Sequence, residues 1–69
     1  MKTLFVHHRG RTIGTVELNG FTRHDLDAAV LRAKHVADDY LSATWTTVEV
    51  FDNGRLAFQV FNPNMERAK

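Results

Sequence analysis

The sequence contains no cysteine, one proline and four glycines among its 69 residues. Without cysteine, the chain can form neither a disulfide nor a zinc site built on thiolates, and cysteine-free chains fit a reducing compartment. A domain of this size buries only about 60% of the surface that its unfolded chain exposes, so it is marginally stable. Small domains often gain the missing stability from a disulfide, a metal or a partner chain. Because disulfides are excluded, we predict self-association as a homodimer.

Neither sign of charge is in clear excess, since nine Lys and Arg residues are balanced by eight Asp and Glu residues. Proteins dedicated to nucleic-acid binding usually carry a basic surplus, so nucleic acid is the less favoured partner. No apolar run approaches the ~20 residues that span a membrane, and the first residues lack the apolar stretch of a secretory signal. We therefore predict a cytoplasmic protein without a membrane segment. No internal repeat is apparent in the sequence.

Residue constellations for catalysis or metal binding are also missing. Ser42 is the only serine, and the pattern places no base near it. His24 and Asp25 are neighbours on a predicted helix, so their side chains diverge, and His7 and His8 point to opposite faces of a predicted strand. The four glycines are scattered and form no phosphate-binding loop. We expect a protein that is not an enzyme and that needs neither a metal nor a cofactor.

One helix is predicted from Arg23 to Ser42 by apolar residues at three- and four-residue spacing. Thr22 is suited to cap its N-terminus, with Asp25 three residues later in the place of a capping-box acid. The apolar stripe consists of Leu26, Ala29, Val30, Ala33, Val36, Ala37, Tyr40 and Leu41.

Four segments rich in threonine, valine and aromatics read as strands, at 3–8, 12–18, 44–51 and 55–61. They pair as two hairpins, and the helix must cover one face of their sheet. The predicted fold class is α+β: a two-layer sandwich of ββαββ order, with one helix packed on a four-stranded, mainly antiparallel sheet. We expect a single domain at 1–62 and a flexible C-terminal tail at 63–69.

The register of each hairpin follows from keeping one face apolar. In the second hairpin, a two-residue turn at Asn53-Gly54 mixes apolar and polar residues on both faces, whereas a three-residue loop pairs Val50 with Leu56. We adopt the three-residue loop. The first hairpin then pairs Leu4 with Val16 and Val6 with Gly14. The predicted core from the helix and the second hairpin is Leu26, Val30, Ala33, Val36, Leu41, Val48, Val50, Leu56, Phe58 and Val60.

The opposite face of the sheet is predicted to expose aromatic residues, because a single helix covers only one side. Contiguous exposed apolar patches mark interaction sites, and aromatics with arginine dominate binding hot spots. The alternative is cross-strand aromatic packing that merely stabilises the sheet. A second alternative is nucleic-acid contact through Arg9 and Arg11 at the first turn. The residues expected to bind a partner protein are Phe5, His7, Ile13, Trp45, Phe51, Arg55 and Phe61.

Two segments, 25–29 (DLDAA) and 48–56 (VEVFDNGRL), carry a resemblance to two groups of small proteins. The first is a family of uncharacterised small bacterial proteins with a similar helix-hairpin pattern, which implies no function. The second is the small phage-encoded anti-CRISPR proteins, some of which carry an alanine-rich helix followed by a hairpin of Thr-Val-Glu type. That resemblance implies an inhibitor that binds a CRISPR effector complex in the bacterial host cytoplasm. Neither resemblance assigns a role to any residue.

Overall fold

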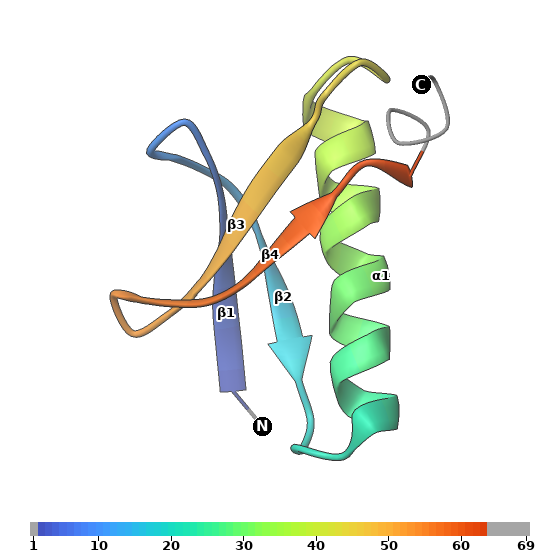
Figure 1. Ribbon diagram of the computed structural model, residues 1–69. Coiled ribbons are helices and arrows are strands. Elements are labelled where there is room, and N and C mark those ends of the chain that lie inside the picture. Colours follow the sequence, from blue (N-terminus) through green and yellow to red (C-terminus); the bar gives the residue numbers. More distant parts are fainter. Residues whose placement is uncertain (1, 64–69) are drawn as a thin grey trace.

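The computed structural model describes residues 2–63, in which one hairpin precedes and another follows a single helix along the chain, and both hairpins lie on the same side of that helix (Figure 1). The elements in chain order are β1 (Lys2–His8), β2 (Arg11–Leu18), α1 (Arg23–Tyr40), β3 (Thr47–Asp52) and β4 (Arg55–Phe61). The strands form one four-stranded antiparallel sheet, and α1 packs on one of its faces. The predicted α+β sandwich of ββαββ order is confirmed. Residues 64–69 of the predicted tail lie outside the described residues.

The two hairpins join through their first strands, which gives the strand order β2-β1-β3-β4. At the junction Phe5 lies opposite Phe51, and Val6 lies opposite Val50. The central strands are therefore β1 and β3, while β2 and β4 form the edges. In Figure 1 the β1–β2 turn lies toward the end of the molecule where α1 finishes, and the β3–β4 turn lies away from it. No helix among residues 2–63 is long and apolar enough to cross a membrane.

Both hairpins are built in the same way, although the sequence shows no obvious repeat. Each turn consists of two residues in the left-handed region, a type I′ geometry whose twist matches that of the strands. Each second strand then carries a bulge, at Ile13 in β2 and at Ala57 in β4, that shifts the pairing by one residue. The turn residues are Arg9 (φ 53°) with Gly10 (φ 81°), and Asn53 (φ 52°) with Gly54 (φ 82°).

The register predicted for the second hairpin is wrong. Val50 lies opposite Phe58 and not opposite Leu56. The turn has two residues, and the bulge at Ala57, not a longer loop, places Val50 and Phe58 opposite each other on one side of the sheet. Phe58 consequently stays on the helix side of the sheet, while Leu56 faces the other side, opposite Phe51. In the first hairpin the predicted pairing of the apolar residues is confirmed.

The helix begins where the sequence predicts, because the capping box forms. The Asp25 amide donates to Thr22 Oγ1 at 3.1 Å, and the Thr22 amide donates to Asp25 Oδ2 at 3.2 Å. α1 ends at Tyr40, short of the predicted Ser42. Leu41 is already extended, with its amide donating to the Ala37 carbonyl oxygen at 2.8 Å.

A stripe of alanines brings α1 close to the sheet. Ala29, Ala33 and Ala37 recur every four residues and are fully buried. Gly14 in β2 permits the approach, because a Cβ built there lies 2.5 Å from Val36 Cγ1. The helix packs mainly over β2, so the inner side of β4 is covered less completely.

The core lies between α1 and the helix side of the sheet. Two of the residues predicted for it are in fact exposed, Leu26 by 38% and Leu56 by 52%. Leu56 leaves the core through the register described above, and Leu26 lies on the first turns of the helix. Val30, Val36, Leu41 and Phe58 are partly buried against the core. The buried core itself is Leu4, Val6, Val16, Leu18, Ala29, Ala33, Ala37, Trp45, Val48, Val50 and Val60.

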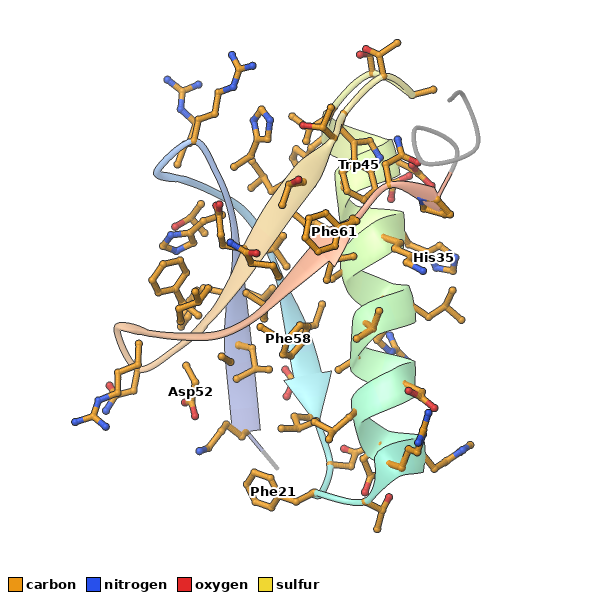
Figure 2. The ribbon with its side chains drawn as sticks, viewed as in Figure 1. Phe21, His35, Trp45, Asp52, Phe58 and Phe61 are labelled. Carbon is orange, nitrogen blue, oxygen red and sulfur yellow. The ribbon has the colours of Figure 1, made fainter. Side chains whose placement is uncertain are left out.

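The chain between α1 and β3 forms a loop where a strand was predicted. β3 begins at Thr47, and this threonine, not Trp45, lies opposite Phe61. Trp45 turns into the core beside the last turns of α1, where only 4% of it is exposed (Figure 2). Its indole Nε1 donates to Asp38 Oδ1 at 2.9 Å. The prediction that Trp45 lies on the exposed face is therefore wrong.

Asn62 fastens this loop to the end of β4. It is a buried polar residue, 2% exposed. Its Nδ2 donates to the carbonyl oxygens of Ala43 at 3.0 Å and Trp45 at 2.7 Å, and its amide donates to the Thr46 carbonyl at 2.9 Å. Buried polar groups are retained when their hydrogen bonds are satisfied, so Asn62 holds the indole-bearing loop in place.

Candidate protein-binding face

The side of the sheet turned away from α1 is covered by no other element of residues 2–63, and we call it the outer face. Successive side chains alternate between the two sides of a strand, and residues opposite each other share a side. The register therefore assigns its members. They are Thr3, Phe5, His7, Thr12, Thr15, Glu17, Thr47, Glu49, Phe51, Leu56, Gln59 and Phe61.

Three of these residues form an apolar row that crosses the sheet from β1 to β4. Phe5 lies opposite Phe51, and Phe51 lies opposite Leu56. Phe5 is 43% exposed and Leu56 is 52% exposed, while Phe51 between them is partly buried. Large apolar side chains that adjoin on a surface are uncommon unless something binds them.

His7 extends the apolar row toward the β1–β2 turn. Its imidazole stacks on the Phe51 ring, with centroids 4.4 Å apart and planes 24° from parallel. Its Nε2 lies 3.1 Å from the Thr12 hydroxyl oxygen, within hydrogen-bonding distance. The His7 ring therefore has a partner on its flat side, Phe51, and another at its edge, Thr12.

Carboxylates flank the apolar row on both sides. Glu17 lies on one side. Its carboxylate accepts a hydrogen bond from the Thr3 hydroxyl, whose oxygen is 3.3 Å from each carboxylate oxygen. Glu49 lies on the other, opposite His7 and Gln59. None of the described residues of the outer face is a lysine or an arginine. The face therefore presents an apolar centre with an acidic border.

The structure places four of the seven predicted partner-binding residues on this face: Phe5, His7, Phe51 and Phe61. Phe61 is 52% exposed but stands apart from the apolar row, beyond Glu49 and Gln59.

The other three predicted residues lie elsewhere. Trp45 is in the core. Ile13 is the bulge residue of β2 and is packed against the core. Arg55 lies opposite Asp52 on the helix side, at the start of β4. Leu56 was missed, and a two-residue Asn-Gly turn followed by a bulge is the pattern that places it on the face.

The residues of the alternative prediction, Arg9 and Arg11, lie at the β1–β2 turn. They line a groove of about 660 Å³ together with Tyr40 at the end of α1. His8 and Arg11 are paired on the helix side of the sheet, and of the described residues of the outer face Thr12 alone lines this groove. Among residues 2–63, no three histidine, aspartate or glutamate side chains gather as metal ligands would.

Comparison with known proteins finds no family model, no curated protein and no solved structure that matches the chain. No relative therefore assigns a role to the outer face or to the groove.

Proposed function

We propose that the protein is a non-enzymatic binding protein whose outer face takes up a partner protein. The observation that carries the proposal is the apolar row of Phe5, Phe51 and Leu56, which crosses three strands on a side of the sheet that no described element covers. Burying apolar area is the main source of affinity between proteins, at about 25 cal/mol per Å² before the costs of association. Rigid aromatic side chains also lose little entropy when they are bound.

The charges of the face indicate what kind of partner fits. Glu17 and Glu49 border the apolar row, and neither is paired with a lysine or an arginine of the described residues in a salt bridge. A partner with an apolar strip between basic residues complements this arrangement. A second copy that stacks face to face adds two more carboxylates to the interface and no lysine or arginine of the outer face to pair with them, which is unfavourable. The proposal therefore commits to a different protein with a basic rim.

The resemblance to small phage-encoded anti-CRISPR proteins supports a more specific form of the proposal. In that form the partner is a CRISPR effector complex, and binding blocks it stoichiometrically. Purified effector complexes of different types, assayed for target cleavage with and without the protein, test this form. Undiminished cleavage by every complex at a molar excess of the protein rejects the anti-CRISPR form. The binding role of the outer face is then tested separately, by comparing Leu56→Gln with Leu31→Gln.

Two leucines of nearly equal exposure allow a matched test of the outer face. Leu56 on the face is 52% exposed and Leu31 on α1 is 54% exposed. Leu56→Gln and Leu31→Gln remove the same apolar group from two different surfaces, so affinity capture from bacterial lysate should lose its specific protein only with Leu56→Gln. With the purified partner, Leu56→Gln should weaken binding by ~2 kcal/mol, about thirtyfold. Equal effects of the two variants contradict the proposal.

Self-association is decided by sedimentation over a range of concentrations. The proposal expects a monomer in solution, with the face free for its partner. A homodimer, as the small size of the chain led us to predict, would contradict this assignment if Leu56→Gln dissociated it and Leu31→Gln did not. That result would show that the outer face is the interface of a homodimer.

A further inference from the structure

Two adjoining grooves lie at the end of the molecule where α1 finishes. The larger, of about 660 Å³, is lined by His8, Arg9, Arg11, Thr12, Ile13, Tyr40 and Leu41. The smaller, of about 220 Å³, is lined by His8, Arg9, Leu41, Ser42, Thr44, Trp45 and Thr46. His8, Arg9 and Leu41 line both, so they form the ridge between them. A ligand that occupies both grooves must be extended and must pass Arg9.

Basic side chains line the grooves, and the nearest carboxylate that the structure connects to them is that of Asp38, which accepts the hydrogen bond of the Trp45 indole. The lining holds two arginines and a histidine, and no aspartate or glutamate is among the described residues that line either groove. Hydroxyl groups supply the remaining hydrogen-bonding capacity, from Tyr40, Ser42 and three threonines. Arginine and hydroxyl groups are the usual contacts to phosphate oxygens in complexes with nucleic acids. The near-zero net charge of the chain conceals this concentration of positive charge.

An aromatic ring stands at the same place. Tyr40, the last residue of α1, is 70% exposed and borders the larger groove. An exposed ring beside a basic track is the arrangement on which unpaired bases stack. The volume of the larger groove lies in the range of small-ligand sites, about 300–1,000 Å³, so it has room for a nucleotide unit.

We propose that these grooves bind single-stranded nucleic acid, with phosphates at Arg9 and Arg11 and a base stacked on Tyr40. A duplex keeps its bases paired and offers no ring to Tyr40. A free mononucleotide fills only the larger groove, and an acidic peptide without aromatic residues has no ring to stack on Tyr40. The proposal does not depend on the apolar row of the outer face, although Thr12 belongs to that face and also lines the larger groove.

Fluorescence anisotropy with a labelled oligothymidylate of about eight nucleotides, within the range of small single-strand sites, tests the proposal. The variant Arg9→Asn/Arg11→Gln removes both charges and keeps the turn, since Asn53 occupies the same left-handed position of the other hairpin. The charge-matched control is Arg23→Ala/Arg32→Ala on exposed positions of α1. Arg23 is about 25 Å from Tyr40 along the helix, at 1.5 Å per residue.

Wild-type protein should bind the oligonucleotide with an affinity that falls with salt. The slope of log affinity against log salt should drop by about 1.4 in Arg9→Asn/Arg11→Gln, since each single-strand phosphate contact contributes about 0.7. In the control Arg23→Ala/Arg32→Ala, the slope of log affinity against log salt should stay close to that of the wild type. Tyr40→Ala should weaken binding about tenfold and Tyr40→Phe should restore it, because stacking needs the ring and not the hydroxyl.

Four results overturn the proposal: no binding of the oligonucleotide at low salt, equal losses in the control, equally tight binding of thymidine monophosphate, or equally tight binding of polyglutamate. The last two would reduce the grooves to a general anion site. Leu56→Gln should bind the oligonucleotide as tightly as the wild type does. If the grooves do not bind the oligonucleotide, the proposal for the outer face is therefore not affected.

Discussion

Replacing Gly14 by alanine should destabilise the protein, although alanine is ordinarily the better residue within a strand. The gain from restricting the unfolded chain is about 0.5–1 kcal/mol. Against it, the new Cβ would lie 2.5 Å from Val36 Cγ1, about 1 Å closer than ordinary contact at 3.4 Å. Overpacking of this kind costs about 1–3 kcal/mol. We therefore expect Gly14→Ala to lower the free energy of unfolding by about 1–2 kcal/mol.

A second substitution separates this clash from other causes. Val36→Ala alone should cost about 1 kcal/mol, because it removes two partly buried methyl groups at about 0.8 kcal/mol for each fully buried one. In Gly14→Ala/Val36→Ala the Cβ has room, so the double variant should be more stable than the sum of the single effects predicts, by about 1 kcal/mol. Urea unfolding, monitored by circular dichroism, measures the free energy of unfolding of the two single variants and of the double variant.

Gly10 provides the matched control for this cycle. A Cβ at Gly10 has no atom within 4 Å, but its φ of 81° strains any other residue. Gly10→Ala should therefore also destabilise the protein, yet its effect should add to that of Val36→Ala without coupling. Additivity in the Gly14 cycle, or a Gly14→Ala variant more stable than the wild type, would refute the close packing of α1 on β2.

Two further predictions concern the loop that holds the indole. Trp45→Phe keeps an aromatic ring in the core and removes the hydrogen bond from Nε1 to Asp38. It should therefore lower the free energy of unfolding, measured with heat or urea, by about 1–2 kcal/mol. The wild-type indole, only 4% exposed, should resist quenching by iodide until the protein unfolds, and ready quenching of the native state would contradict its burial. Asn62→Ala removes the donor to the carbonyl oxygens of Ala43 and Trp45 and should lower the free energy of unfolding by about 1–3 kcal/mol, mainly through the buried bond to Trp45, because Ala43 is exposed. Asn62→Asp should cost more, because a carboxylate would face the same two oxygens, and a stability equal to the wild type in either variant would reject the role given to Asn62.

The helix and the class of fold follow from local signals that the sequence carries openly. The apolar stripe of α1 has the period of a helix, and Thr22 with Asp25 marks its first turn, so the helix is predictable from residues that contact one another within a few positions. The apolar residues of the first hairpin likewise determine their own pairing. These parts of the structure required no knowledge of distant contacts.

The errors have two causes: a single residue that shifts a register, and tertiary packing that overrides a local preference. A bulge such as that at Ala57 changes which side of the sheet Leu56 faces, and no local composition marks it. Trp45 lies at the start of a run of residues that suit a strand, but its ring is buried in the core, and Asp38 and Asn62 supply its polar partners. Tertiary packing therefore decided its position against strand propensity. The prediction that Phe5 and Phe51 share the outer face is confirmed, because the two residues lie opposite each other where the hairpins join, on the strands that carry no extra residue.

The most direct test of the account is a map of the residues that contact the partner. Backbone amide shifts of the isotope-labelled protein, measured by NMR with and without the captured partner, provide it. We predict that the largest changes fall on Phe5, Phe51 and Leu56 and on their neighbours across the sheet. Changes confined to the exposed side of α1, around Leu31, would contradict the assignment of the outer face as the binding surface.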